Sequence, residues 1–176
     1  MKIIPHEEIN LLLPIECKEE LLEIKDYYEL KYSKTSSGHA FRSYTKSASD
    51  VYNLRNKTKY MRTDSWIRIP RTAQWITNNL CDESKLGMVC LNKLSAGGSV
   101  KWHSHGLYDM KIVHFSLITN KNDLSEVRKD NKTYAMNYPE REGYIFNSVM
   151  EHRSTNFSEH DRIHLVVECS YIHSMI

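Results

Sequence analysis

The stretch RIHLVVEC, residues 162–169, decides the fold class. Successive side chains of a β-strand point to opposite faces, so this segment would present one wholly apolar face and one mixed face. Four apolar residues alternating with two charged residues, a histidine and a valine are typical of a strand buried on both sides. The two faces are Ile163, Leu165, Val167 and Cys169 on one side, and Arg162, His164, Val166 and Glu168 on the other.

The mixed face of this strand carries an arginine and a histidine. Burying these side chains costs free energy unless hydrogen-bond partners or an anion are present. The planar guanidinium of Arg162 suits a carboxylate. Two interpretations stay open from the residues alone. Arg162 binds an anionic ligand, or it forms an internal ion pair for which Asp161 and Glu168 are the candidates.

Further strand-like segments precede residues 162–169 and are separated by turns such as SAGG at 95–98 and TNKND at 119–123. Six or seven short strands in the second half predict a mainly β fold with a compact barrel core. The expected strands are residues 86–94, 99–105, 111–119, 134–138, 143–149 and 162–169.

The first half of the chain has a different residue pattern. Helical spacing of apolar residues predicts a helix over 15–32, and a second short helix should begin at Thr72 as its N-cap. The Ser/Thr-rich residues 33–49 are typical of a loop, an edge or a flap over the core. We therefore expect a single domain over 1–176, with helices and substrate-side loops in 1–82 and the β core in 83–176.

Composition excludes several classes of function. The 176 residues carry 24 Lys plus Arg against 22 Asp plus Glu, and this balance argues against duplex nucleic acid as a partner. No apolar stretch is long enough to span a bilayer, and the opening MKIIPHEEIN has acids where a signal peptide needs an apolar core. Four cysteines without a C-x-x-C pair are expected to be reduced and structural. We expect a cytoplasmic protein that does not contact a membrane.

The nine histidines include the group WHSH at 102–105. On a strand, His103 and His105 point to the same face and can converge on one metal ion, for which neutral imidazole is a good ligand. An H-x-H pair alone is a weak signal. A barrel can bring His152, which follows the strand 143–149, beside this pair. His114, on the segment 111–119, shares its face with apolar neighbours and by itself is typical of a core histidine.

Five segments together resemble the aspartyl/asparaginyl β-hydroxylase family. They are GSVKWH at 98–103, HFSLITN at 114–120, GYIFN at 143–147, HRSTN at 152–156 and DRIHLV at 161–166. Members are Fe(II)- and 2-oxoglutarate-dependent dioxygenases with a double-stranded β-helix, a jelly-roll or cupin-like barrel. The resemblance covers about residues 86–169. It implies hydroxylation of a free amino acid or of a peptide or protein side chain, with release of succinate and CO2.

The resemblance also implies roles for individual residues. His103 and His152 are similar to the iron ligands, and Arg162, ten residues after His152, matches the arginine that pairs with the far carboxylate of 2-oxoglutarate. His114 matches a histidine that helps to hold this cosubstrate. Asn156 matches a position with a structural role.

Two positions depart from the pattern. The wider superfamily places a carboxylate two residues after the first histidine, where this chain has His105. Three possibilities stay open: His105 binds the metal, it turns away and leaves a water, or Asp109 supplies the carboxylate. Three neutral ligands would leave Fe(II) at a charge of +2, whereas a carboxylate would lower it to +1. Some members also place an arginine two residues before the histidine matched by His114, where this chain has Ile112, with Lys111 as the nearest cation.

Substrate contacts are expected from the loop 106–110, from Arg153 and from the 33–49 segment, and Arg42 and Arg153 could hold a substrate carboxylate although each is more typical of a surface arginine. Trp102 should point away from His103 into the core.

Three rival functions remain. One is a cupin-type three-His dioxygenase that needs no 2-oxoglutarate, and another is a non-catalytic metal-binding or sensor barrel. The third uses the Lys/Tyr-rich segment 44–62 to bind single-stranded nucleic acid, although a solvated surface explains that segment more simply. Arg162 separates the first two from a 2-oxoglutarate enzyme, because a barrel without a dicarboxylate has little reason to turn an arginine inward.

Overall fold

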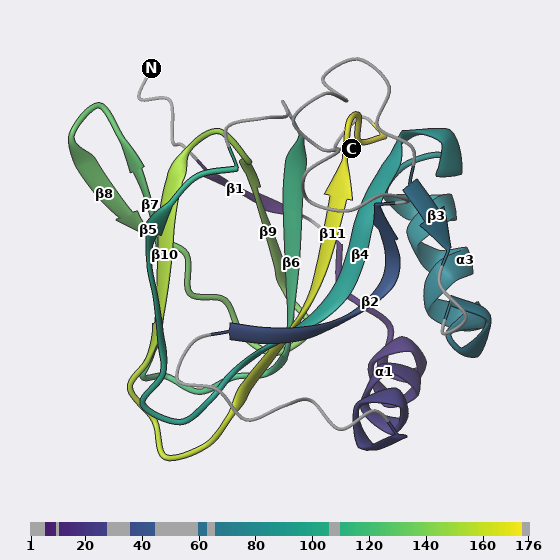
Figure 1. The fold of residues 1–176 in the computed structure, drawn as a ribbon, viewed down its shortest axis with the longest axis horizontal. Helices are drawn as coiled ribbons and strands as arrows, with labels where there is room; N and C mark the ends of the chain where they lie inside the picture. The colour runs from purple at the N-terminus through teal and green to yellow at the C-terminus, as the bar shows by residue number, and fades with distance from the viewer. Residues whose placement is uncertain are drawn as a thin grey trace.

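Two antiparallel β-sheets face each other in the computed structural model, and helices cover the outer side of the larger one (Figure 1). The structure describes residues 6–9, 11–27, 36–44, 60–62, 66–105 and 110–173, and it describes side chains over 11–24, 66–105 and 110–173. Among these residues, no helix combines the length and hydropathy that crossing a membrane requires.

The larger sheet has seven strands and the smaller one has four, and every neighbouring pair is antiparallel. The order in the larger sheet is β1 (His6–Ile9), β9 (Gly143–Asn147), β6 (Lys111–Ile118), β11 (Arg162–Cys169), β4 (Leu86–Leu94), β2 (Ser36–Tyr44) and β3 (Tyr60–Arg62). The order in the smaller sheet is β5 (Ser99–His103), β10 (Glu151–Asn156), β7 (Asp123–Lys129) and β8 (Lys132–Ala135). This is the mainly β, double-stranded β-helix fold expected from the sequence.

The expected helical layer is also present. Helices α1 (Ile15–Tyr27) and α3 (Pro70–Asn79) pack on the outer face of the larger sheet, with the short 3-10 turns η1 (Trp66–Arg68) and η2 (Glu83–Lys85) beside α3 (Figure 1). One apolar cluster joins helix residues such as Leu21 and Ile76 to sheet residues such as Leu165, all of them without exposed surface. Burial of the apolar side chains between the helices and the larger sheet is the main stabilising contribution to the packing of the helices.

Strand β11 lies at the centre of the larger sheet and is buried along its whole length. Its alternation is as predicted. Ile163, Leu165, Val167 and Cys169 join the outer cluster under the helices, whereas Val166 joins a second cluster between the two sheets. The inner cluster is Cys90, Ile112, Val127, Met136, Tyr144, Phe146 and Val166.

Strands β7 and β10 were not predicted from the sequence, and β8 was expected at 134–138, a few residues too late. Both missed strands read as polar, DLSEVRK and EHRSTN, because only one of their faces meets the inner core. The tight β7–β8 turn at Asp130 and Asn131, with φ angles of 50° and 61°, has the left-handed conformation of a two-residue hairpin. Asparagine and aspartate adopt it at little cost, and this signal was also overlooked.

The expectation of a loop or edge over 33–49 was wrong for its central part. Residues 36–44 form the regular strand β2, which pairs with β4 on one side and with β3 on the other. Three strands of the larger sheet thus come from the first 82 residues, where only helices and loops were expected. Residues 33–35 and 45–49 lie outside the described residues, and the single-domain boundaries stay a prediction.

Helix α3 begins earlier than predicted, and Thr72 is not its N-cap. Ile69 occupies the cap position, Pro70 is the first helical residue, and the side chain of Ile69 makes no capping bond. The free amides are satisfied by α1 instead. Glu20 accepts bonds from the backbone nitrogens of Arg71 (3.1 Å) and Thr72 (2.8 Å) and from the Thr72 hydroxyl (2.7 Å). A carboxylate some fifty residues away in sequence caps this helix, so no local pattern could indicate it.

Strand β6 contains one β-bulge, which changes the face of the sheet on which its last residue lies. Its pairing with β11 shifts between Ile163 and His164, so that β6 has an extra residue at Leu117. Ile118 consequently packs against the outer cluster rather than sharing the face of His114.

Candidate metal centre

Three histidines converge where β5 ends and β10 begins. His103 and His152 are direct cross-strand neighbours, with ring centroids 4.2 Å apart. The ring of His105, just beyond β5, lies 5.2 Å from His103 and 5.1 Å from His152. One ligand atom from each residue can be chosen so that all three lie within 4.8 Å of one another, an arrangement that could hold one metal ion.

A β-bulge lies beside this group. The register of β5 and β10 shifts between His152 and Ser154, so Lys101 and Trp102 together stand opposite the single residue Arg153. Bulges twist a strand locally and redirect its side chains, and they are frequent next to active sites. Here the bulge directly precedes His103.

In two of the three rings, Nδ1 is hydrogen-bonded to a backbone carbonyl oxygen. Nδ1 of His103 lies 2.8 Å from the carbonyl oxygen of Lys101, and Nδ1 of His152 lies 2.8 Å from that of Met150. A carbonyl oxygen only accepts hydrogen bonds, so each Nδ1 carries the hydrogen. Each Nε2 then presents a lone pair, which is the form of histidine that binds metals.

The electrostatics favour the same neutral form. Burial lowers the pKa of His152 to about 4, against the upward effect of its bond to Met150, and the charges of His103 and His105 lower it further. Burial, assisted by His103, also lowers the pKa of His105. Both rings are therefore neutral at physiological pH, and a cation does not have to displace protons from them.

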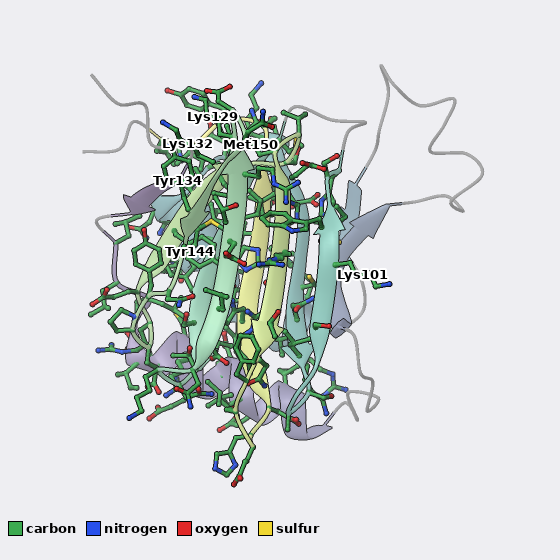
Figure 2. The ribbon with its side chains drawn as sticks, turned by 90° about the vertical axis from the view of Figure 1, so that its left-hand side faces the viewer. Lys101, Lys129, Lys132, Tyr134, Tyr144 and Met150 are labelled. Carbon is green, nitrogen blue, oxygen red and sulfur yellow. The ribbon has the colours of Figure 1, made fainter. Side chains whose placement is uncertain are left out.

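The histidines border a cavity of about 160 Å³ between the two sheets. Tyr144 of β9 is 1% exposed and belongs to the inner cluster, whereas Lys101 of β5 points away into solvent (Figure 2). Cys90 is one of four buried free cysteines, and burial, with the charge of Glu168, raises its pKa to about 12. The lining residues are Met88, Cys90, Asn92, Val100, His103, His105, Ile112, His114, His152, Ser154, Arg162, Val166 and Glu168.

Arg162 lines the cavity and is only 2% exposed. Its Nη1 donates to the Ser125 hydroxyl at 2.9 Å, and its Nε is a buried donor without a hydrogen-bond partner in the part of the chain that the structure describes. Burial lowers the pKa of this guanidinium, opposed by Tyr144 and Asp123.

The internal ion pair that the sequence left open for Arg162 is not formed with either candidate. Asp161 pairs with Lys93 at 3.0 Å and accepts from the amide of Ala96. Glu168 accepts from the amide of Met88 at 3.4 Å and lies near His105. Over the described residues, no carboxylate makes an ion pair with Arg162. A buried cation of this kind is costly unless an anion reaches it.

His114 lies between the metal group and a second buried histidine. Its Nδ1 is 3.3 Å from Nδ1 of His164, and Nε2 of His164 is 3.4 Å from the Ser116 hydroxyl. His114 also stacks on Tyr144, with ring centroids 5.0 Å apart. Burial, with the charge of Arg162 second, lowers the pKa of both histidines well below the usual value. The result is a neutral hydrogen-bond chain that ends at the cavity wall.

The expectation that Trp102 is a core residue was wrong, whereas Arg153 is the surface arginine that the sequence favoured over a substrate contact. Trp102 is outside both core clusters, and the Cζ atoms of Arg128 and Arg153 lie 4.1 and 4.8 Å from its ring centroid. Arg153 also pairs with Glu126 through Nε and Oε2, 2.5 Å apart. Both residues are on the outer face of the smaller sheet, because they alternate with His103 and His152. Arg153 is therefore a surface arginine that does not reach the cavity.

Asn156 has the structural role that the resemblance implied. It is fully buried, and its side-chain amide donates to the carbonyl oxygens of Leu94, Ser95 and His160. These bonds fix the turn that leads into β11. The loop 106–109 with Asp109, the side chain of Arg42, and residues 45–59 of the suggested nucleic-acid segment lie outside what the structure describes.

Two residues of the cavity region were not predicted from the sequence. Ser125 belongs to β7, a strand that was not expected, so its contact with Arg162 could not be foreseen. Glu168 was assigned to the inward face of β11 but was considered only as a partner of Arg162. The alternation of β11 contained the signal that could have placed it beside the histidines.

Known structures share this architecture. SnoK, a non-heme α-ketoglutarate-dependent carbocyclase from nogalamycin biosynthesis, superposes with a TM-score of 0.62 at 9% identity, over 94% of this chain and 80% of that one. A prolyl-4-hydroxylase from Pseudomonas putida gives 0.57 at 11% identity, over 94% and 91%. A 2OG-Fe(II) oxygenase family oxidoreductase from Burkholderia pseudomallei gives 0.52 at 7% identity, over 80% and 68%. No curated protein matches the sequence.

At these identities the neighbours show only that the fold is the double-stranded β-helix. The family model provides more. The model described as Aspartyl/Asparaginyl beta-hydroxylase matches residues 17–171, which include nearly all of α1, the whole of α3 and all four histidines at the cavity, and extend well beyond the 86–169 region of the resemblance. The chain therefore belongs to the aspartyl/asparaginyl β-hydroxylase family.

Proposed function

We propose that this protein is an Fe(II)- and 2-oxoglutarate-dependent oxygenase that hydroxylates an amino acid or an amino-acid side chain. His103, His105 and His152 would hold the iron, and Arg162 would bind the far carboxylate of 2-oxoglutarate. The observation that carries the proposal is the buried guanidinium of Arg162. It opens into the same cavity as three metal-competent histidines, and no carboxylate among the described residues pairs with it.

Arg162 also argues against the rival functions. A three-His dioxygenase that works without 2-oxoglutarate would have to place an anionic substrate on this arginine to offset the cost of burying it. The same cost applies to a metal-binding barrel without a dicarboxylate ligand. A planar guanidinium with an unused donor is well suited to a bidentate carboxylate.

When bound, Fe(II) and 2-oxoglutarate supply the oxidising chemistry, in which dioxygen hydroxylates a C–H bond and 2-oxoglutarate becomes succinate and CO2. The chain's own contribution is binding and orientation. The neutral histidines offer their Nε2 lone pairs, and their backbone partners at Lys101 and Met150 keep two of the rings from rotating. The apolar walls at Ile112 and Val166 exclude water.

His114 would help to hold the cosubstrate in the cavity. The Ser116 hydroxyl has one hydrogen and two partners at 3.4 Å, the carbonyl oxygen of Tyr138 and Nε2 of His164. If it donates to His164, Nδ1 of His164 donates to Nδ1 of His114, and Nε2 of His114 carries a hydrogen toward the cavity, which is the tautomer that suits a carboxylate. Ser116 and His164 thus act as positioning residues for His114.

Family membership supports an amino acid or a peptide side chain as the substrate. Met88, Cys90 and Asn92 of β4 also line the cavity, and we infer that they contact the substrate. None of them carries a charge at neutral pH, and the burial that raises the pKa of Cys90 keeps its thiol protonated.

The test is an anaerobic titration of Fe(II)-loaded protein with 2-oxoglutarate, followed by the visible metal-to-ligand charge-transfer band. The band should form in the wild type, disappear in Arg162→Ala, and persist in Arg153→Ala, a matched variant that removes an arginine from the outer face. If protein shown to hold one iron per chain gives no band, the 2-oxoglutarate proposal is wrong, and a three-His dioxygenase without 2-oxoglutarate becomes the better explanation.

A further inference from the structure

The third histidine differs from the other two in the oxygen that faces its Nδ1. His103 and His152 each bond a backbone carbonyl at 2.8 Å. Nδ1 of His105 instead lies 4.0 Å from Oε1 of Glu168. At 4.0 Å this pair is not yet a hydrogen bond, and the acceptor beside Nδ1 of His105 is a side-chain carboxylate rather than a backbone carbonyl.

We propose that Glu168 is the outer carboxylate of the metal centre. It would accept a hydrogen bond from Nδ1 of His105, hold that ring in the tautomer that offers Nε2 to the metal, and supply the negative charge that position 105 lacks. This inference rests on the proposed function, since it needs the three-His site. It favours metal binding by His105 over a His105 that turns away from the metal and over a carboxylate supplied by Asp109.

The backbone around Glu168 is shaped to place this side chain. The register of β11 and β4 shifts between Val167 and Cys169, so Gly87 and Met88 together stand opposite Glu168. A Cβ at position 87 would lie 2.7 Å from Cε of Met110, 3.0 Å from the Cβ of Glu168 and 3.2 Å from its carbonyl oxygen, so a glycine permits this close approach without crowding. Glu168 is on the inward face of β11, opposite this bulge, and it lines the cavity with 5% of its surface exposed.

The second oxygen of the carboxylate is fixed as well. Oε2 of Glu168 accepts from the amide of Met88 at 3.4 Å, and Oε1 is the carboxylate oxygen that lies 4.0 Å from Nδ1 of His105. The His105 side chain is 40% exposed, and in this proposal its ring moves from 4.0 Å to hydrogen-bond distance of Oε1 when the metal binds.

Charge balance supports the same role. Glu168 is the one carboxylate among the described residues that line the cavity, and Arg162 is the one permanent cation. With Arg162 reserved for an anionic cosubstrate, three neutral imidazoles would leave a divalent metal at +2. A carboxylate that bonds a ligand histidine lowers the net charge of the centre to +1 and makes that histidine a better donor.

The experiment is an anaerobic titration with Co(II) alone, without 2-oxoglutarate, of the wild type and Glu168→Gln, followed by the cobalt ligand-field absorption. Loss of an outer carboxylate typically weakens metal binding by about 10- to 100-fold, and we expect this for Glu168→Gln. Glu151→Gln is the matched control, because Glu151 pairs with Arg128 on the outer face next to His152, so the variant removes the same charge without touching His105. Its Co(II) affinity should stay within about twofold of the wild type.

A double-mutant cycle with His105→Ala separates positioning from a general structural effect. In the His105→Ala background, Glu168→Gln should change Co(II) affinity by less than about twofold. Near-UV circular dichroism of the metal-free proteins shows whether each variant is folded, and Glu168→Asp, which withdraws the carboxylate from His105, should lose affinity even if Glu168→Gln does not fold.

The outcomes separate the two proposals. If the wild type binds no Co(II) at one ion per chain, the three-His centre itself is wrong. If the wild type binds Co(II) and folded Glu168→Gln binds it equally well, the role of Glu168 is wrong while the proposed function stands. An equal loss of affinity with and without His105 would also contradict the proposal.

Discussion

Along β11 the two faces of the larger sheet are buried to nearly the same degree, but their chemistry differs. On β11, Leu165 and Val167 face the helices with no exposed surface, and Arg162 and His164 face the smaller sheet with 2% and 3%. Folding alone would favour apolar side chains on both faces, because burying a polar group gains nothing over packing a methyl group. The outer face therefore carries stability, whereas the inner face is retained for what it binds.

The largest effect should come from the outer face. Leu165→Ala removes a fully buried side chain under the helices and should lower the free energy of unfolding by about 2–5 kcal/mol. Urea denaturation of the metal-free protein measures it. Co(II) and 2-oxoglutarate affinities of the folded fraction should hardly change, and a large loss of ligand binding would show that the two faces do not act separately.

A substitution on the inner face should instead weaken ligand binding and leave the free energy of unfolding nearly unchanged. Arg162→Met removes a buried cation that pairs with no carboxylate of the described residues, so the free energy of unfolding should stay within about 1 kcal/mol of the wild type or rise. The 2-oxoglutarate affinity of the Fe(II) form should fall about 100-fold, since the far carboxylate loses its charged partner. Calorimetric titration and urea denaturation provide the two readouts. Strong destabilisation with unchanged affinity would assign Arg162 to the fold.

The histidines of the inner face predict that the free energy of unfolding decreases at acidic pH. The pKa of His152 in the folded protein is about 4, below its ordinary 6.5, so between these values only the unfolded chain binds the proton. The free energy of unfolding should therefore fall as the pH is lowered from 6.5 toward 4, with up to about 1.4 kcal/mol per pH unit for one histidine. His105, His114 and His164 shift in the same direction.

The measurement is urea denaturation in EDTA at successive pH values. His152→Gln should make the pH dependence shallower by about the contribution of one proton. An unchanged slope in this variant would mean that His152 is not held neutral by burial.

The smallest effect should come from the outer face of the smaller sheet. Arg153→Ala removes one of two cations stacked on Trp102, together with its ion pair to Glu126, and should cost at most about 1 kcal/mol. It should leave Co(II) and 2-oxoglutarate affinity unchanged in calorimetric titrations. A clear loss of either affinity would return Arg153 to the substrate side, where the sequence alone allowed it to be.

The sequence predicted the strands that are buried on both faces, since β4, β6, β9 and β11 are apolar runs bounded by turns. It missed β7 and β10 because each has a polar outer face, and it could not indicate that Glu20 caps α3 across some fifty residues. Strand alternation and family resemblance correctly brought His103, His105 and His152 together. The alternation of β11 indicated the inward face of Glu168, but it could not indicate the bulge in β4 opposite this residue, because a bulge leaves no periodic signal in a sequence.

The central claim is that the inner face holds one metal ion and one dicarboxylate. An anaerobic crystal structure with Fe(II) and 2-oxoglutarate, with anomalous diffraction at the iron edge, tests it most directly. We predict one anomalous peak bounded by Nε2 of His103, His105 and His152, and a 2-oxoglutarate carboxylate on the guanidinium of Arg162. Iron bound elsewhere, or a guanidinium of Arg162 that stays without an anion in the presence of 2-oxoglutarate, would contradict the account.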